Sequence, residues 1–273
     1  MRELERDLPA KPLEATLDAP AAFVRLVVMG AGRAGGAITA AATSAGIEVD
    51  LLGRNDDVDV ADPNATAVLL CVPDSEIAGA CEVIATALPA GTAVGHVSGA
   101  TTLTALGAAA AVGCPTFSIH PLQTIPAPDT KLDGAPCAVA GSDDRALAAA
   151  RDLAVALQMR PFEVPEDGRT AYHAAASMAS NFLVALEESA AELLAAAGVA
   201  DPREVLAPLV LRSAANWADA GADALTGPIA RGDETTGAEH LRALGERAPQ
   251  LRPLYEALAE RTRAVAAGTE EPR

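Results

Sequence analysis

The stretch from Phe23 to Gly35, FVRLVVMGAGRAG, decides how the rest of the chain is interpreted. Its first seven residues form a short apolar run ended by glycine, which is typical of a buried strand. GxGxxG follows at once, and a helix-like, alanine-rich segment over residues 35–45 comes next. In this position Gly30 permits a tight turn, Gly32 lets the backbone approach a pyrophosphate, and Gly35 lets helix and strand pack closely. The stretch predicts a dinucleotide-binding unit, with a ligand-free glycine turn as the alternative.

The end of the second predicted strand bears on which dinucleotide binds. NAD-binding units usually carry Asp or Glu about 20 residues after the glycines, where it bonds the ribose 2′-hydroxyl. Arg54 stands there instead, and an arginine can pair with a 2′-phosphate through charge-assisted hydrogen bonds. We therefore expect NADP (NADPH) as the cofactor, with Arg33 of the glycine turn contributing to its binding. Alternatively, Arg54 is a solvated loop residue or is engaged by Asp56 and Asp57.

Further strand-like runs follow the first one, over residues 48–52, 67–72, 92–97, 116–119, 135–140 and 160–164. The early runs alternate with helix-like stretches over residues 35–45 and 75–88, which is typical of parallel βαβ units. The sequence thus predicts an α/β fold of the Rossmann type, a doubly wound parallel sheet with helices on both faces.

The pattern of apolar residues changes after about Pro165, where the strand-like runs stop. Residues 170–197 form one long alanine- and leucine-rich stretch without internal Gly or Pro, which predicts one long helix. Asp201-Pro202 is typical of the start of another helix, which breaks near Gly221. A glycine- and proline-containing turn over residues 226–233 precedes two more helical segments. We expect a loose tail over residues 1–21, a dinucleotide-binding domain over 22–165 and an all-α domain over 166–273.

Composition narrows the possible functions of this 273-residue chain. Its formal net charge is −17, which repels nucleic acid and anionic membranes, and aromatic residues for base stacking make up only 3%. We therefore expect neither nucleic acid nor a membrane as a partner. No apolar run is long enough to span a bilayer, and the charged N-terminus does not resemble a secretion signal, so we expect a cytoplasmic protein. The cysteines form no CxxC pair, which predicts reduced, buried thiols: Cys71, Cys81, Cys114 and Cys137.

Ligands of open α/β sheets bind beyond the carboxyl ends of the strands. Residues that follow the predicted strands are therefore candidate ligand contacts: Val72, Pro73 and Ser98 for the cofactor and His120 for the substrate. Each strand-end histidine could instead be a hydrogen-bonded structural residue. A metal site formed by His96, His120 and His173 has no local ligand spacing behind it, so we predict no metal.

Two polar clusters lie in the predicted all-α domain. Four residues at intervals of four, Arg169, His173, Ser177 and Asn181, follow one face of a helix. Such a polar stripe lines a cleft or bonds another helix, and we favour the cleft. The second cluster, Asn216, Arg231 and Asp233, includes part of the compact turn, and we expect it to bind an anionic small-molecule substrate, with a purely structural turn as the alternative.

Six motifs occur in order along the chain: GAGRAGG, VPD, HVSGA, IHPLQT, YHAAASMASN and LTGPIARGD. Together they resemble a bacterial family that joins a Rossmann-like domain to a C-terminal domain of unknown function, DUF2520, and the resemblance covers about residues 23–267. That family is related to the 6-phosphogluconate dehydrogenase-like reductases, which include ketopantoate and pyrroline-carboxylate reductases. The resemblance implies NADP binding in the first domain and a homodimer formed through the helical domain.

The resemblance and the polar clusters together predict an NADPH-dependent reductase of a small 2-oxo acid, with ketopantoate, a precursor of pantothenate, as the first candidate. His173 would donate the proton or orient a water that does, Ser177 and Asn181 would bond the carbonyl oxygen, and Arg231 would pair with the carboxylate. Ketopantoate reductases use a lysine on the first helix of the second domain, whereas this chain has only Lys11 and Lys131. The alternatives are an imine reductase, a deazaflavin-dependent oxidoreductase and a non-catalytic NADP sensor.

Overall fold

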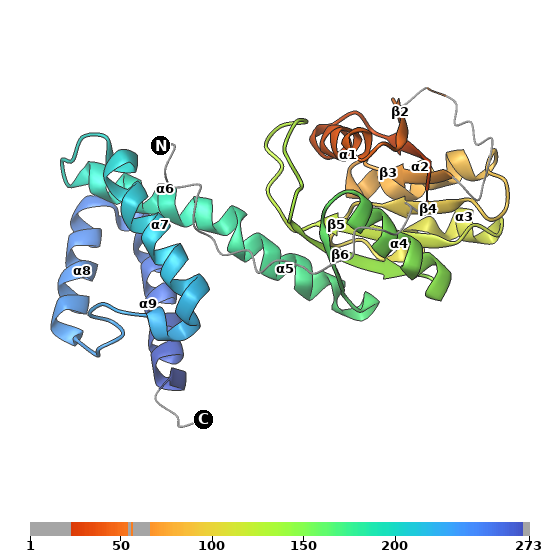
Figure 1. The fold of residues 1–273 in the computed structure, drawn as a ribbon. Coiled ribbons are helices and arrows are strands. Elements are labelled where there is room, and N and C mark those ends of the chain that lie inside the picture. Colours follow the sequence, from red (N-terminus) through yellow and green to blue (C-terminus); the bar gives the residue numbers. More distant parts are fainter. Residues whose placement is uncertain (1–22, 54–55, 57–65, 270–273) are drawn as a thin grey trace. The chain divides into compact units, whose positions relative to one another are not determined.

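The computed structural model describes residues 23–53, 56 and 66–269 (Figure 1). These residues divide between Met178 and Ala179 into two compact units, called here the sheet unit and the helical unit. The division places residues 166–178 with the sheet, whereas the sequence indicated a boundary after residue 165. The expected tail over residues 1–21 and Arg54 lie outside the described residues.

The sheet unit contains a seven-stranded sheet with the order β2-β1-β3-β4-β5-β6-β7. Its strands are β1 (Arg25–Met29), β2 (Glu48–Leu52), β3 (Thr66–Leu70), β4 (Ala93–His96), β5 (Thr116–Pro121), β6 (Pro136–Gly141) and β7 (Arg160–Glu163). Strands β1 to β5 are parallel, as predicted, whereas β6 runs antiparallel to β5. The connection over residues 122–135 contains no helix, and parallel neighbours usually need a helical crossover, so this pair can reverse direction.

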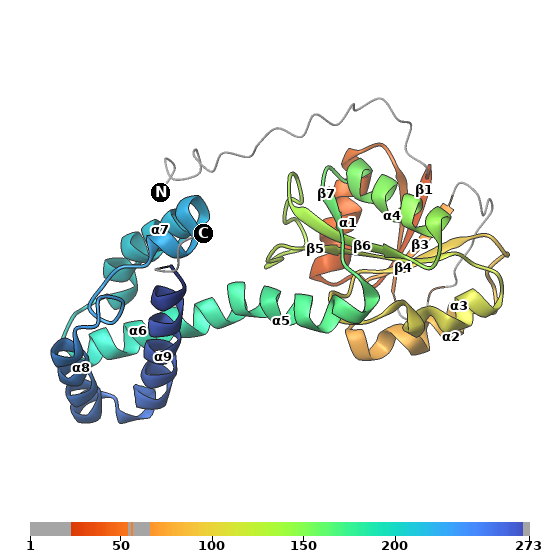
Figure 2. The same cartoon turned by 90° about the horizontal axis from the view of Figure 1, so that it is seen from below.

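Helices cover both faces of this sheet (Figure 2). They are α1 (Arg33–Ser44), α2 (Ile77–Ala85), α3 (Gly107–Ala111) and α4 (Asp144–Ala156). Successive side chains of a strand point to opposite faces, so Leu26 and Val28 of β1 join the cluster under α1 and α4, while Val27 and Met29 join the cluster under α2 and α3. The sheet therefore has a separate apolar core on each face, which confirms the doubly wound prediction.

All four cysteines lie in the sheet unit, and all are free and buried. Burial disfavours the thiolate, and it raises the pKa of the Cys71 and Cys137 thiols to about 12. The four thiols are therefore buried and outside any disulfide, as predicted.

The helices that follow the sheet are α5 (Arg169–Ala179), α6 (Asn181–Ala196), α7 (Pro202–Ala220), α8 (Glu234–Arg247) and α9 (Arg252–Thr269). The prediction of one continuous helix over residues 170–197 is wrong, because Ser180 leaves the helical conformation at φ −125° and ψ −78°. Serine and asparagine side chains compete for backbone hydrogen bonds, so Ser180-Asn181 is a suitable place for a break. The four-residue spacing therefore ends on α5, and Asn181 begins α6.

Short 3₁₀ turns join several of these elements: η1 (Asp74–Glu76), η2 (Leu103–Leu106), η3 (Glu166–Gly168), η4 (Gly221–Ala224) and η5 (Pro249–Leu251). As predicted, α7 begins at Pro202 and stops before Gly221, although the Asp201 side chain makes no capping hydrogen bond.

None of the helices within the described residues is both long and apolar enough to cross a membrane.

The helical unit buries little of its own apolar surface. Among its described residues, the buried apolar side chains are Leu244, Ala248 and Ala259, while α6 and α7 bury none fully. Large apolar side chains on α6 and α7 face solvent instead: Phe182, Leu183, Val184, Val205, Leu209, Leu211 and Trp217. Trp217, the single tryptophan of the chain, is 68% exposed.

Candidate functional site

The glycine turn between β1 and α1 is shaped by two close backbone approaches. Gly30 has a φ of +113°, and a Cβ at this position would lie 2.5 Å from the Cys71 carbonyl oxygen. A Cβ on Gly35 would overlap the Gly30 carbonyl oxygen, so only glycine lets α1 sit this close to the turn. Gly32, by contrast, is exposed, with no atom within 4 Å of a Cβ built there. The turn is closed on the protein side and open at Gly32.

The start of α1 suits an anion. Gly32 occupies the N-cap position without a side-chain cap, and the first turn of α1 carries no acidic residue. Its backbone N–H groups and the positive end of the helix dipole are thus available to a phosphate. Arg33 is exposed at the same place. Strand β1 lies between β2 and β3, so this helix begins at the point where the strand order reverses, the usual ligand position in such sheets.

The neighbouring strand ends complete this part of the edge. Val72 is half-buried and Pro73 is exposed directly after β3, where the Val72 backbone nitrogen lies close to the Gly30 turn. At the end of β2, the Asp56 carboxylate accepts a hydrogen bond of 2.8 Å from the Gly53 N–H. Asp56 therefore has a backbone partner of its own.

A second cluster lies at the ends of β4 and β5. A Cβ on Gly99, in the loop after β4, would meet His120 Cε1 at 2.8 Å and His173 Cδ2 at 2.9 Å. The His120 and His173 rings stand edge to face, with centroids 6.1 Å apart. Three separate elements, the β4 loop, β5 and α5, thus bring two imidazoles together over the Gly99 backbone.

Arg169 at the start of α5 fixes the loop that carries Gly99. Its side chain is fully buried, and Nη2 donates a 2.7 Å hydrogen bond to the Ser98 carbonyl oxygen. Nη1 lies 3.5 Å from Glu166, whose other carboxylate oxygen accepts a hydrogen bond from the Leu103 N–H. Burial lowers the pKa of Arg169, and the nearby Glu166 carboxylate opposes this effect. Arg169 and Glu166 together tie α5 to both ends of the loop.

The Ser98 hydroxyl makes its hydrogen bonds within this loop. Its Oγ accepts hydrogen bonds from the backbone N–H groups of Ala100 and Thr101 and donates to the Thr101 hydroxyl. The Ser98 N–H in turn donates to His96 Nδ1 at 3.2 Å. His96 and Ser98 therefore shape the loop, and the sequence prediction that Ser98 contacts the cofactor stays a prediction.

The histidines at these strand ends are uncharged at neutral pH. Burial, followed by the charge of Arg169, lowers the pKa of His96 to about 4. Burial, followed by the neighbouring His173 and Arg169, lowers the pKa of His120 to about 4. Burial also raises the pKa of Tyr172, which contacts His120, to about 12. The site thus offers neutral hydrogen-bonding groups rather than fixed charges at His120 and Tyr172.

The predicted site residues fall into two groups. His120 and His173 come together in the sheet unit, and Ser177 is half-buried one turn beyond His173 on α5. Asn181, Asn216 and Arg231 are exposed residues of the helical unit. Asp233, also there, is the N-cap of α8.

The capping role gives Asp233 a structural task. Its carboxylate accepts hydrogen bonds from the Thr236 N–H at 3.0 Å and from the Thr236 hydroxyl at 2.7 Å. These bonds lower the pKa of Asp233. The compact turn predicted over residues 226–233 is present, and it ends in this cap.

Sequence reasoning missed three contributors: Tyr172, Gly99 and the buried role of Arg169. The spacing of Arg169 and His173 marked the correct helix face. Nothing local, however, indicates that Tyr172 meets a histidine 52 positions earlier in the chain.

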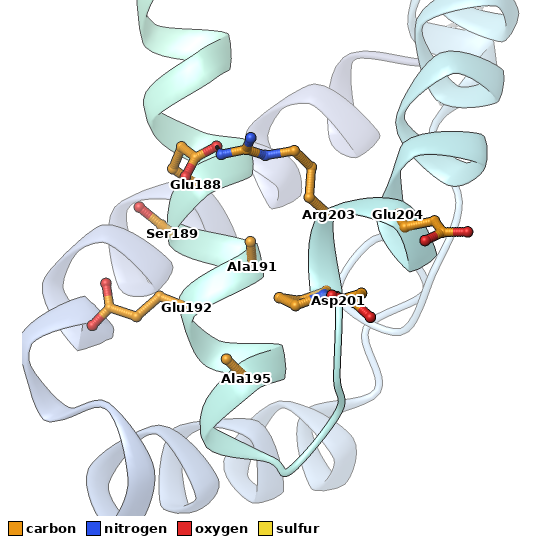
Figure 3. Close-up of a pocket in the computed structure, with 9 residues that line it drawn as sticks. Glu188, Ser189, Ala191, Glu192, Ala195, Asp201, Arg203 and Glu204 are labelled. Atoms are coloured by element: carbon orange, nitrogen blue, oxygen red, sulfur yellow. Dashed lines mark hydrogen bonds and ion pairs between the residues drawn. The ribbon is translucent and has the colours of Figure 1, made fainter. Parts of the chain in front are cut away.

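A large hollow of about 760 Å³ lies elsewhere, between α6 and the start of α7 in the helical unit (Figure 3). Its charged lining residues are Glu188, Glu192, Asp201, Arg203 and Glu204, and the single cation, Arg203, donates to Glu188 at 2.7 Å. The excess of carboxylates would repel an anionic substrate, so we do not assign the substrate to this hollow. Among the described residues, no cluster of His, Cys, Asp or Glu could hold a metal ion.

Two known domain families match successive parts of the chain. Residues 54–121 match the Rossmann-like domain, and residues 135–262 match the domain of unknown function DUF2520. Comparison with curated protein sequences returns no significant match. The two domains are the pair expected from the motifs.

Solved structures share the fold at low sequence identity. A Bacteroides fragilis protein, described as a candidate NADP oxidoreductase, is 22% identical with a TM-score of 0.74; the match covers 90% of this chain and 100% of that one. A Thermotoga maritima protein is 23% identical with a TM-score of 0.67, again over 90% and 100%. An Aspergillus terreus reductive aminase, in complex with NADPH and ethyl-5-oxohexanoate, is 17% identical with a TM-score of 0.61, over 90% and 98%.

Proposed function

We propose that this chain, which carries a Rossmann-like domain followed by a DUF2520 domain, is an NADPH-dependent reductase of a small 2-oxo acid. One observation carries the proposal: an anion-binding glycine turn and a histidine pair occupy the same edge of one sheet. Strands β1, β3, β4 and β5 are parallel, so the turn after β1 and His120 near the end of β5 both lie at their carboxyl ends. Nucleotide and substrate meet at this edge in α/β enzymes.

The described residues fit the cofactor. The open backbone at Gly32 and the uncapped start of α1 would hold the pyrophosphate, with Arg33 as a proposed partner of the 2′-phosphate. Arg54, which lies outside the described residues, is the second proposed partner from the sequence. Bound NADPH supplies a hydride to the oxo carbon. The NADP oxidoreductase and reductase descriptions of the B. fragilis and A. terreus proteins support this choice.

The proton and the substrate contacts come from the chain itself. His173 donates a proton to the developing alkoxide, and Ser177 on the same helix bonds the substrate oxygen. For the helical unit, the sequence-based assignment of Arg231 to the substrate carboxylate and of Asn181 and Asn216 to substrate binding stays a prediction. Ketopantoate is the first candidate among the small 2-oxo acids.

Imine reduction is the second candidate. The A. terreus enzyme is described as a reductive aminase, and it shares the fold over 98% of its length. In an imine reductase the same histidines would face a C=N bond, and a protonated imine would not need a carboxylate partner such as Arg231.

The test begins with NADPH fluorescence in the purified protein. We expect a change on NADPH binding, followed by a decay that depends on ketopantoate or another 2-oxo acid. His173→Ala should lower turnover about 10²- to 10⁴-fold while the Kd for NADPH stays unchanged. His240→Ala, at an exposed histidine of α8, is the matched control and should change neither quantity.

Other outcomes separate the alternatives. Turnover with cyclic imines but with no 2-oxo acid would replace the proposal by imine reduction. NADPH binding without turnover of either class, and without an effect of His173→Ala, would contradict an enzymatic role.

We also propose that the protein is a homodimer whose subunits meet through the helical unit. The large exposed apolar side chains of α6 and α7 support this, since exposed apolar surface of this kind is suited to protein association. A second copy would supply the same apolar surface and so cover both at once.

A further inference from the structure

We propose that Tyr172 is a positioning residue: it fixes the neutral imidazole of His120 with the ring proton on Nε2, so that His120 donates a hydrogen bond to the oxo oxygen of the substrate. The role toward substrate rests on the proposed reductase function, whereas the state of the ring can be measured without it. All residues involved belong to the sheet unit.

The contact between the Tyr172 and His120 side chains is short, and a third ring packs against Tyr172. Tyr172 Oη lies 2.6 Å from His120 Nδ1, and the two rings stand edge to face at 88° with centroids 5.6 Å apart. Phe162 of β7 packs against the Tyr172 ring at 6.0 Å. Tyr172 is thus held between β5 and β7, and its hydroxyl is aimed at one particular nitrogen.

The direction of this hydrogen bond follows from the chemistry of the two groups. A phenol is the stronger donor, and a neutral imidazole has one nitrogen that can only accept. Burial keeps the Tyr172 phenol protonated by raising its pKa to about 12. Burial, His173 and Arg169 lower the pKa of His120 to about 4, and Asp74 opposes them only weakly. Tyr172 therefore donates to Nδ1, which leaves the His120 proton on Nε2.

The His120 Nε2 atom lies next to Gly99. A Cβ on Gly99 would lie 2.9 Å from His120 Nε2 and 2.9 Å from His173 Cδ2, which is a clash, so only glycine lets both rings approach the loop this closely. Within the described part of the chain, no residue accepts the Nε2 proton. Arg169 holds the neighbouring Ser98 carbonyl in place. The His120 donor and His173 therefore both lie beside the Gly99 backbone.

This arrangement divides the work between the two histidines. His120 polarises the C=O bond through its N–H without giving up the proton, as suits a ring that stays neutral. His173 transfers its own proton to the oxygen as the carbon receives hydride, and then regains a proton from water. A chain without a lysine on α5 can polarise the oxo group in this way.

The state of the ring can be read by NMR in the protein without NADPH. Long-range ¹H–¹⁵N spectra distinguish the two neutral tautomers and the charged ring, and His120→Gln identifies the His120 signals. At pH 7 we expect the proton on Nε2 in the wild type and a mixture of tautomers in Tyr172→Phe. The proposal is overturned if the wild-type proton sits on Nδ1, if the ring is charged, or if Tyr172→Phe leaves the tautomer unchanged.

The chain offers a matched control in the helical unit. His240 Nδ1 and Tyr255 Oη are 2.7 Å apart, and their rings make the same edge-to-face contact with centroids at 5.9 Å. Tyr255→Phe removes an equivalent hydroxyl, so it should leave the His120 signals unchanged.

Kinetics tests the consequence for the substrate. Tyr172→Phe should lower kcat about fivefold and leave the Kd for NADPH unchanged, while Tyr255→Phe should alter neither. A kcat equal to wild type would overturn the role toward substrate. Should Tyr172→Phe not fold, the wild-type tautomer between pH 5 and 8 still decides the assignment. A protein without turnover but with the Nε2 proton would contradict the reductase proposal and leave the tautomer established.

Discussion

The sheet unit and the helical unit solve the problem of burying apolar surface in opposite ways. The sheet unit has two apolar cores, one on each face of the sheet. It also buries polar side chains, among them Arg169, His96 and Ser118. The helical unit keeps few buried side chains and presents apolar ones on α6 and α7. One unit buries its apolar side chains within itself, whereas the other leaves large apolar side chains exposed.

This difference shows where each kind of function can be located. A neutral histidine and a buried arginine require surroundings that exclude water, which the sheet unit provides. An exposed apolar surface is suited to association. Chemistry is therefore expected in the first unit, and assembly in the second.

The largest expected effect is a loss of stability in the sheet unit, caused by a substitution in its glycine turn. Gly35→Ala adds a methyl group that overlaps the Gly30 carbonyl oxygen, so we expect the free energy of unfolding to fall by about 3 kcal/mol in urea titrations. Gly79→Ala is the matched control, because no atom lies within 4 Å of that position on α2, and it should be neutral or stabilising by about 0.5 kcal/mol. Equal losses in the two variants would refute the close approach.

The next effect concerns assembly alone. Trp217→Ser should raise the Kd of the proposed dimer about 30-fold, since a large aromatic side chain at an interface commonly contributes about 2 kcal/mol. Sedimentation velocity at several concentrations measures this. Val83→Ser, at a position of α2 that is 71% exposed in the sheet unit, should leave the association unchanged. A monomeric wild-type protein would contradict the dimer.

A smaller effect compares a buried cation with an exposed one. Arg169→Met removes the hydrogen bond to Ser98 and the contact with Glu166, and should lower the free energy of unfolding by about 2 kcal/mol. Arg151 pairs with Glu163 on the surface, so Arg151→Met should cost no more than about 0.5 kcal/mol. Chemical unfolding measures the free energy of unfolding of both variants. Equal losses would show that the buried contacts of Arg169 stabilise the protein no more than a surface ion pair does.

The smallest effect is a pH dependence of the sheet unit. The pKa values of His96 and His120 fall from 6.5 to about 4 on folding, so the unfolded chain binds more protons between these values. The stability these groups contribute is complete above pH 6.5 and is lost as the pH falls toward 4. His120→Gln should lose about 1 kcal/mol less than wild type between pH 7 and pH 5. Parallel stability curves for the two proteins would be incompatible with a neutral, buried His120.

The sheet unit was largely predictable because its signals are local. Strand β2 occupies the predicted residues 48–52, and the apolar run before Gly30 became β1. Alternating burial and the spacing of glycines follow directly from strand and turn geometry. The direction of β6 was not predictable in this way, since it depends on a connection without helix rather than on the strand itself.

The site was predictable only in part. The ends of β4 and β5 and the polar face of α5 indicated His120 and His173, because these positions follow from strand order and helical period. The partnership of Tyr172 with His120 depends on two elements meeting in space, which no local pattern encodes. The break at Ser180 was missed for a related reason, since helix-forming residues continue on both sides of it.

The distribution of two rare side chains gives the chain its own reporters. Every cysteine is buried in the sheet unit, and the single tryptophan stands in the helical unit. Thiol labelling of the native protein therefore records opening of the sheet unit alone, while Trp217 fluorescence records the surroundings of α7 alone. The unmodified protein can thus show, in one denaturation experiment, whether its two halves come apart together or one after the other.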